Sequence, residues 1–192
     1  MKIYTKTGDQ GLTSLFGGQK ISKSSELLHA YGSLDELVDV MGVLVAHLMT
    51  FPICTSCVSQ LQSIQKDIFI LSSFLATPYD KRTKLKITPL TGEHVKQIEE
   101  WIDHMEIELS PLSSFILPGG HVTAAYAQLA RTVARRAERD IIYCYELTPA
   151  CKVPHSIELI NRLSDYLFVL SRFLNLKMKT KEVAWPMSQV SD

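Results

Sequence analysis

The chain has 192 residues with 20 Lys and Arg against 20 Asp and Glu, so it has no basic field for non-specific nucleic-acid binding. Its length suits one domain with a sizeable core, and a hydrophobic content of 46% excludes a disordered chain. No apolar run is long enough to span a bilayer, and the first residues carry no apolar signal core. We therefore expect a cytoplasmic protein without nucleic-acid or membrane partners.

Residues 1–25 are rich in Gly, Thr, Ser and Lys and lack apolar periodicity, which predicts a loop with a short strand. The run YTKTGDQG starts at Tyr4. Glycines let backbone N–H groups wrap an anion, while hydroxyl groups and lysines add donors and charge. The run matches neither the Walker loop nor the Gly-x-Gly-x-x-Gly fingerprint. A plain turn-rich start remains an alternative interpretation.

Apolar residues recur at alternating spacings of four and three over residues 27–48, which predicts a packed helix. A capping-box match at Ser33–Glu36 suggests that this helix begins there. Further helices are expected at 61–75, 95–105, 122–146 and 159–174, with loops at 79–90 and 113–120. The pattern predicts an all-α fold, a five-helix antiparallel bundle. We expect a single domain over 1–192, comprising an irregular nucleotide-binding segment (1–25), the bundle (26–178) and a tail (179–192).

The expected helix at 122–146 carries Arg131, Arg135 and Arg139 at i, i+4 and i+8, with Glu138 on the same side. Three adjacent guanidinium groups repel one another, which favours an anionic ligand, and their forks match phosphate geometry. The alternative is a solvated helix face. The opposite side is expected to be a buried stripe of Tyr126, Leu129, Val133, Ala137 and Ile141.

Several other positions allow both a functional and a purely structural interpretation. Asp35 could serve a site or simply favour a helix dipole, and Phe115 could contact a ligand or pin its loop. Asn161, Asp165, Phe168 and Arg172 lie along one edge of the last helix, an edge that is usually solvent-facing in bundles. Cys54 and Cys57 form a Cys-x-x-Cys without a second close pair, which favours structural cysteines over a metal or redox motif.

Five sequence blocks together resemble the PduO-type ATP:cob(I)alamin adenosyltransferases. They are YTKTGDQG from Tyr4, YGSLDEL from Tyr31, SFILPGG from Ser114, ARTVARRAER from Ala130 and NRLSDYLF from Asn161. They follow the family's order with similar spacing from end to end. The resemblance implies a five-helix bundle that assembles as a homotrimer with sites between subunits. It also implies transfer of the 5′-deoxyadenosyl group of ATP to the cobalt of cob(I)alamin, with release of triphosphate.

The same resemblance implies a set of site residues. The implied ATP-binding residues are Thr5, Lys6, Thr7, Gly8, Thr13, Lys23, Arg135, Arg136, Glu138, Arg139 and Asn161. Those implied to act in the reaction are Arg131, Arg135, Glu138, Phe115 and Asp35, with Arg131 contacting ATP and pairing with Asp35 across the interface. The implied cobalamin contacts are Phe115, Asp165 and Phe168, with Phe115 beneath the corrin ring, where it keeps the lower cobalt position empty. Glu138 is the expected Mg²⁺ ligand, with Asp165 as a second candidate.

This chain departs from the family's usual pattern at three positions. Val38 replaces a common Asn, Gln128 a common His and Lys20 a frequent Arg. Neither Val38 nor Gln128 is assigned to the chemistry, so these two changes are expected to affect local packing or pairing. Lys20 keeps the charge of arginine but loses its fork.

The implied chemistry agrees with the residues that are present. Cobalt(I) is a strong nucleophile that needs no general base, and no catalytic triad pattern stands out. The protein would align the reactants and stabilise the leaving triphosphate. A reductase and an adenosylcobalamin-dependent enzyme are expected partners. The alternatives are a phosphoryl-transfer enzyme, a binding module without turnover, and a purely structural bundle.

Overall fold

The computed structural model describes Tyr4 and residues 6–185. Five α-helices dominate the described part: α1 (Glu26–Leu48), α2 (Thr55–Leu75), α3 (Gly92–Glu106), α4 (Val122–Leu147) and α5 (Ser156–Lys177). The short elements are strands β1 (Leu12–Ser14) and β2 (Lys20–Ser22) and the 3-10 helices η1 (Pro52–Cys54), η2 (Tyr79–Lys84) and η3 (Pro149–Cys151). The expected all-α bundle is confirmed.

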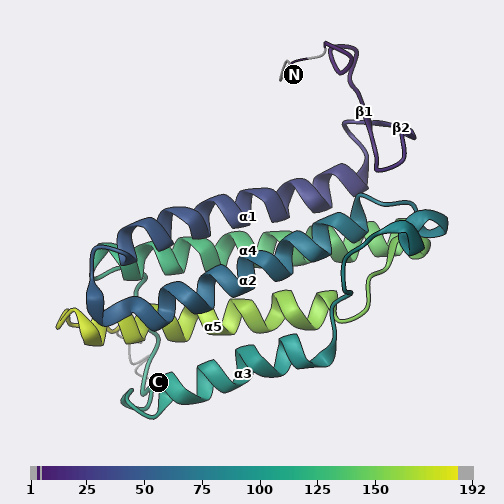
Figure 1. The fold of residues 1–192 in the computed structure, drawn as a ribbon. Helices are drawn as coiled ribbons and strands as arrows, with labels where there is room; N and C mark the ends of the chain where they lie inside the picture. The colour runs from purple at the N-terminus through teal and green to yellow at the C-terminus, as the bar shows by residue number, and fades with distance from the viewer. Residues whose placement is uncertain (1–3, 5, 186–192) are drawn as a thin grey trace, which may run out of the picture.

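Helix α4 lies at the centre of the bundle. It packs against both α1 and α5, while α2 packs on α1 and α3 packs on α5. Successive helices run in opposite directions (Figure 1). The buried side of α4 includes five alanines, Ala124, Ala127, Ala130, Ala134 and Ala137. Their small side chains let α4 approach two neighbours closely, which places its outer residues at a fixed distance from α1 and α5.

The predicted start of α1 at Ser33 is wrong. The helix begins at Glu26, where Ser25 is the N-cap and its hydroxyl accepts a hydrogen bond from the Leu28 N–H at 3.4 Å. Ser33 lies inside the helix, and its hydroxyl donates to Asp140 of α4. The capping-box pattern misled because the apolar repeat, and with it the core packing, already begins at Leu27.

The predicted buried stripe of α4 is wrong at Leu129 and only partly correct at Tyr126. Val133, Ala137 and Ile141 are buried as expected, but Leu129 is 48% exposed and Tyr126 is only half-buried. The alanines occupy the line where the helix contacts its neighbours, so the larger leucine lies on the outer surface.

The two ends of the bundle carry different accessory structure (Figure 1). Strands β1 and β2 form an antiparallel hairpin beyond the N-terminal end of α1, with Thr13 opposite Ile21. At the other end, the loop at 113–120 makes an isolated antiparallel bridge between Ile116 and Ala184 of the tail. The expected loop at 79–90 contains η2. Among the described residues, no helix has the length and apolarity needed to cross a membrane.

Candidate active site

Helix α4 presents a cationic face formed by Arg131, Arg135 and Arg139. Arg131 is half-buried and its Nε donates to Gln128 Oε1 at 2.8 Å, while Arg139 Nη1 donates to the Arg135 carbonyl at 2.9 Å. Burial, and then the charge of Arg135, lower the pKa of Arg131. Within the described part of the chain, no carboxylate forms an ion pair with these three guanidinium groups. The face is therefore suited to an external anion.

Glu138 and Asn161 join this face from adjacent helices. Asn161 Nδ2 on α5 donates to Glu138 Oε1 on α4 at 3.0 Å. The sequence prediction grouped these two residues only through the resemblance, and the structure brings them into direct contact. Arg136 differs, because its guanidinium pairs with Glu36 of α1. Arg136 therefore belongs to the α1 side of α4.

A cavity of about 460 Å³ links the loop of Phe115 to the arginine helix. Its lining includes Phe115, Phe168, Gln128 and Arg131. Phe115 is 69% exposed, so its ring is available to a large planar ligand. Phe115 and Phe168, which are far apart in sequence, thus meet beside the first arginine of the cationic face.

Sequence reasoning missed Gln128 as a member of this site. Its amide group donates from Nε2 to Ser171 Oγ at 2.7 Å, and its Oε1 accepts from Arg131. The buried amide is held by Ser171 of α5 and in turn fixes the direction of the Arg131 guanidinium. The available signal was its position three residues before Arg131, one turn away on the same side of the helix.

Asp165 lies away from this cavity within the chain. Its carboxylate accepts from Arg162 Nη1 at 2.8 Å, and Arg162 Nε reaches Glu99 of α3 at 2.9 Å. Asp165 and Arg162 line a separate cavity between α3 and α5. The predicted role of Asp165 toward cobalamin or Mg²⁺ stays a prediction, and its side chain already has a cationic partner.

The opening segment folds into a compact series of turns. The Asp9 N–H donates to the Lys6 carbonyl at 3.4 Å, the Gly11 N–H to the Gly8 carbonyl at 3.2 Å, and the Lys23 N–H to the Gly11 carbonyl at 2.8 Å. A Cβ on Gly8 would lie 3.1 Å from Lys23 Nζ, so the ammonium group sits against the glycine backbone. The structure thus gathers the predicted residues Lys6, Gly8 and Lys23. Thr5 lies outside the described residues.

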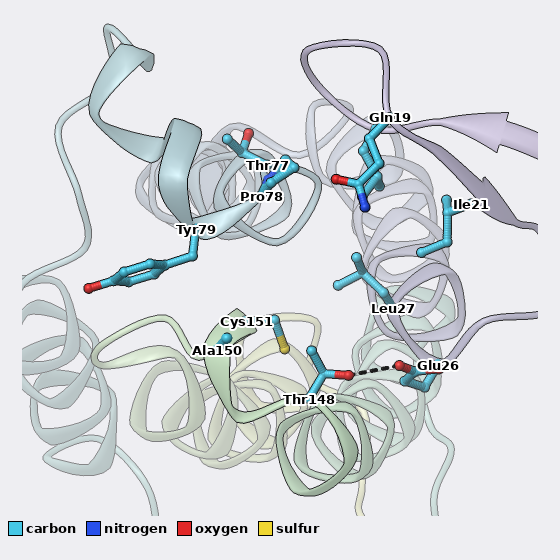
Figure 2. A pocket seen from close by; sticks show the side chains of 11 residues that line it. Gln19, Ile21, Glu26, Leu27, Thr77, Pro78, Tyr79, Thr148, Ala150 and Cys151 are labelled. Atoms are coloured by element: carbon cyan, nitrogen blue, oxygen red, sulfur yellow. Dashed lines mark hydrogen bonds between the residues drawn. The ribbon is translucent and has the colours of Figure 1, made fainter.

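The hairpin that follows is anchored to one end of the bundle. The Phe16 N–H donates to the Ala76 carbonyl at 2.9 Å, and Lys81 Nζ donates to the Gly17 carbonyl at 3.3 Å. Figure 2 shows the cavity of about 220 Å³ beneath it, where Thr148 of the α4–η3 connection donates to Glu26 of α1 at 2.9 Å. These contacts fix where the opening segment leaves the bundle.

Two parts of the predicted site share no hydrogen bond or ion pair within the described chain. The opening turns lie beyond the N-terminal end of α1, at the far side of the molecule from the α5 C-terminus (Figure 1). The described residues Lys6, Gly8, Thr13 and Lys23 make no hydrogen bond or ion pair with the three arginines of the cationic face. Asp35 is exposed on α1, and its charge adds to burial in raising the pKa of Tyr31.

The Cys-x-x-Cys pair lies in the core. Cys54 and Cys57 are both buried free thiols at the start of α2. Burial, more than the neighbouring Cys54, raises the pKa of Cys57 to about 11. Among the described residues, no group of three or more His, Cys, Asp or Glu side chains could hold a metal ion. A protonated, buried thiol is a poor nucleophile and a poor metal ligand, which suits a packing role.

Comparisons with known proteins define the family. A profile of the cobalamin adenosyltransferase family matches residues 3–174. Corrinoid adenosyltransferases of Mycobacterium leprae and Bacillus subtilis are 38% and 36% identical to this chain, covering 91% and 99% of it and 91% and 95% of their own lengths. A variant PduO-type ATP:corrinoid adenosyltransferase from Lactobacillus reuteri, complexed with cobalamin and ATP, superposes with a TM-score of 0.85 at 31% identity over 96% of both chains. The chain belongs to the cobalamin adenosyltransferase family.

Proposed function

We propose that this protein transfers the 5′-deoxyadenosyl group of ATP to the cobalt of cob(I)alamin, forming adenosylcobalamin and releasing triphosphate. The observation that carries the proposal is the continuity between two surfaces. The cavity beside Phe115 ends at Arg131, the first residue of a cationic face that lacks acidic partners in the described chain. An apolar wall for a corrin ring therefore adjoins a surface for a triphosphate.

The arginines act on the leaving group. Negative charge moves onto the triphosphate as its bond to the 5′ carbon breaks, and fixed guanidinium groups stabilise that charge without reorganising. Gln128 holds the Arg131 fork in one direction, and the α4 backbone carries Arg135 and Arg139 on successive turns. Alignment of the sugar carbon with the metal is the second contribution of the site.

Phe115 supplies the wall below the corrin. An exposed phenyl ring on a loop fixed at both ends can exclude water and the tail base from the lower face of cobalt. Loss of that ligand makes cobalt(II) easier to reduce to the nucleophilic cobalt(I). Phe168 extends the apolar surface from α5.

One carboxylate suits a magnesium ion here. Mg²⁺ is usually held by one or two protein carboxylates together with substrate phosphates. Glu138 fits that demand, because its carboxylate lies on the cationic face and Asn161 takes only its Oε1, which leaves Oε2 without a hydrogen-bond partner among the described residues. Bound there, Mg²⁺ would neutralise charge on the phosphates. Asp165 fits less well, because its carboxylate already forms an ion pair with Arg162.

The proposal places the complete site between neighbouring copies in a homotrimer. Lys6, Gly8 and Lys23 form a donor-rich turn that is separate from the arginines of their own chain. A second copy would bring these turns, and Asp35, to the cationic face and to Arg131. We also propose that the enzyme is cytoplasmic. A reductase would supply its reduced cobalamin, and an adenosylcobalamin-dependent enzyme would use its product.

The test is incubation with chemically reduced cobalamin, ATP and Mg²⁺ while the visible spectrum and the phosphate products are followed. Formation of adenosylcobalamin with stoichiometric triphosphate supports the proposal. Release of ADP and phosphate would instead identify a phosphoryl-transfer enzyme. Tight binding of both ligands without a cobalt–carbon bond would identify a binding module.

A further inference from the structure

We propose that Arg172 of α5 is a positioning residue, which sets the loop of Phe115 by tying it to the C-terminal tail. Its guanidinium reaches both segments at once. Arg172 Nη2 donates to the Ser110 carbonyl at 2.8 Å, and Nε lies 3.3 and 3.4 Å from the two carboxylate oxygens of Glu182. The effect on catalysis rests on the proposed function, whereas the tie itself does not.

The burial of this ion pair distinguishes it from a surface contact. The Arg172 side chain is 8% exposed and that of Glu182 is 25% exposed. A guanidinium taken out of water is costly unless its donors are satisfied, so a buried arginine with two different acceptors constrains both of them. Removal of one acceptor leaves the charge partly unpaired in the protein interior.

The tail that Glu182 anchors is the strand partner of the Phe115 loop. The Leu117 N–H donates to the Val183 carbonyl at 2.8 Å, and the Trp185 N–H donates to the Phe115 carbonyl at 2.7 Å. The rings of Phe115 and Trp185 lie 6.4 Å apart between centroids. Because side chains alternate between the two faces of a strand, a slip of one residue in this pairing would turn the Phe115 ring away.

Asn175 holds the end of the same loop one turn further along α5. Its Nδ2 donates to the Gly119 carbonyl at 3.2 Å, and its Oδ1 accepts from the His121 N–H at 2.9 Å. Gly120 has a φ of +94°, and a Cβ there would lie 2.3 Å from Asn175 Oδ1. One face of α5 thus contacts the segment that leads into the loop, at Ser110 through Arg172, and the end of the loop through Asn175.

The experiment compares Glu182→Ala with a matched control, Glu108→Ala. Glu108 also forms an ion pair with α5, at 2.6 Å from Lys177 Nζ, but its side chain makes no hydrogen bond or ion pair with the described part of the tail. Hydrogen exchange is measured at the amides of Leu117 and Trp185, which donate across the loop–tail bridge. We expect exchange at these amides to accelerate on the order of tenfold in Glu182→Ala and to stay at the wild-type rate in the control.

Kinetics supply the second measurement. Glu182→Ala should lower kcat for adenosylation while the KM for ATP holds, because the change lies at the corrin wall and not at the triphosphate face. Arg172→Lys should behave like Glu182→Ala, since an ammonium keeps the charge but cannot reach both acceptors as a fork. If Arg172→Lys kept both the kcat and the KM for ATP of the wild-type protein, the proposal would be overturned.

The exchange and kinetic results separate two kinds of failure. Unchanged amide exchange in Glu182→Ala would refute the tie itself. Faster exchange with an unchanged kcat would refute positioning of Phe115 by the tie. If the wild-type protein forms no adenosylcobalamin, the proposed function fails, and the exchange comparison still decides whether Arg172 and Glu182 fix the loop.

Discussion

The α4 face and the opening segment both present cations to the same proposed triphosphate, but they are built differently. On α4, Arg131 and Arg135 project from the central helix of the bundle, whose buried alanines fix its position. In the opening segment, Lys6 and Lys23 lie on backbone turns outside the bundle, and the hairpin between them is anchored to it through Phe16 and Gly17. The arginines therefore lie on a helix packed at the centre of the bundle, whereas the lysines lie on a peripheral segment that, in the proposed trimer, a neighbouring copy contributes to the site.

The largest effect should come from disabling either half of the site. Lys23→Ala and Arg135→Ala each remove a cation from one half, and each should lower adenosylation roughly 10²–10³-fold. If the two variants are unfolded together and refolded as a 1:1 mixture, about a quarter of the sites in random trimers would combine two intact halves. Activity should therefore return to about a quarter of the wild-type value.

The mixture has two controls. Each variant refolded alone must stay inactive, and sedimentation must show the same assembly for all samples. A mixture no more active than its components would mean that both halves belong to one chain, which would remove the proposed intersubunit site.

The next largest effect concerns the apolar wall. Phe115→Ala keeps the loop backbone, whose hydrogen bonds run through main-chain groups, but removes the ring that shields the lower face of cobalt. We expect the adenosylation rate to fall on the order of 10²-fold while ATP affinity holds. Stopped-flow absorbance gives the rate and calorimetry gives the ATP affinity. Equal losses in both quantities would show that Phe115 supports the nucleotide site as well.

The residues that the sequence located correctly are those that repeat. The α5 leucines at 159, 163 and 167 are buried as their spacing predicts, because helix periodicity fixes which side meets the core. Ser25, not Ser33, caps α1, although Ser33 and Glu36 match the capping-box pattern, because core packing already begins at Leu27. Local pattern alone is therefore ambiguous at helix ends.

The site was located less completely, for a different reason. Gln128 contacts Arg131 one turn along α4 but also Ser171 on α5, and Arg172 contacts Ser110 and Glu182 on other segments. Helix spacing connects Gln128 with Arg131 alone, because the other contacts depend on how α4, α5 and the tail pack. The placement of Arg136 beside Glu36 depends on packing in the same way.

A smaller effect should distinguish two adjacent arginines of α4. Arg135→Lys keeps the charge but loses the two-point contact with phosphate, so kcat/KM for ATP should fall about tenfold. Arg136→Lys is the matched change on the side that pairs with Glu36, and it should stay close to wild type. Steady-state kinetics at varied ATP measures both. An equal loss in Arg136→Lys would place that residue on the nucleotide and show that its pair with Glu36 opens on binding.

The smallest effect should appear where the opening segment meets the bundle. Ser25→Ala removes the side-chain acceptor for the Leu28 N–H, and such a loss typically lowers the free energy of unfolding by about 1 kcal/mol. Ser24→Ala is the control, because Ser24 is exposed and its hydroxyl bonds to Ser22 within the same turn. Urea denaturation followed by circular dichroism gives both values.

A loss confined to Ser25→Ala would show that α1 is stabilised from its true first turn. The KM for ATP of this variant would show whether fraying of that turn also displaces Lys23. An unchanged KM despite lower stability would mean that the turn around Gly8 holds its shape independently of the helix it precedes.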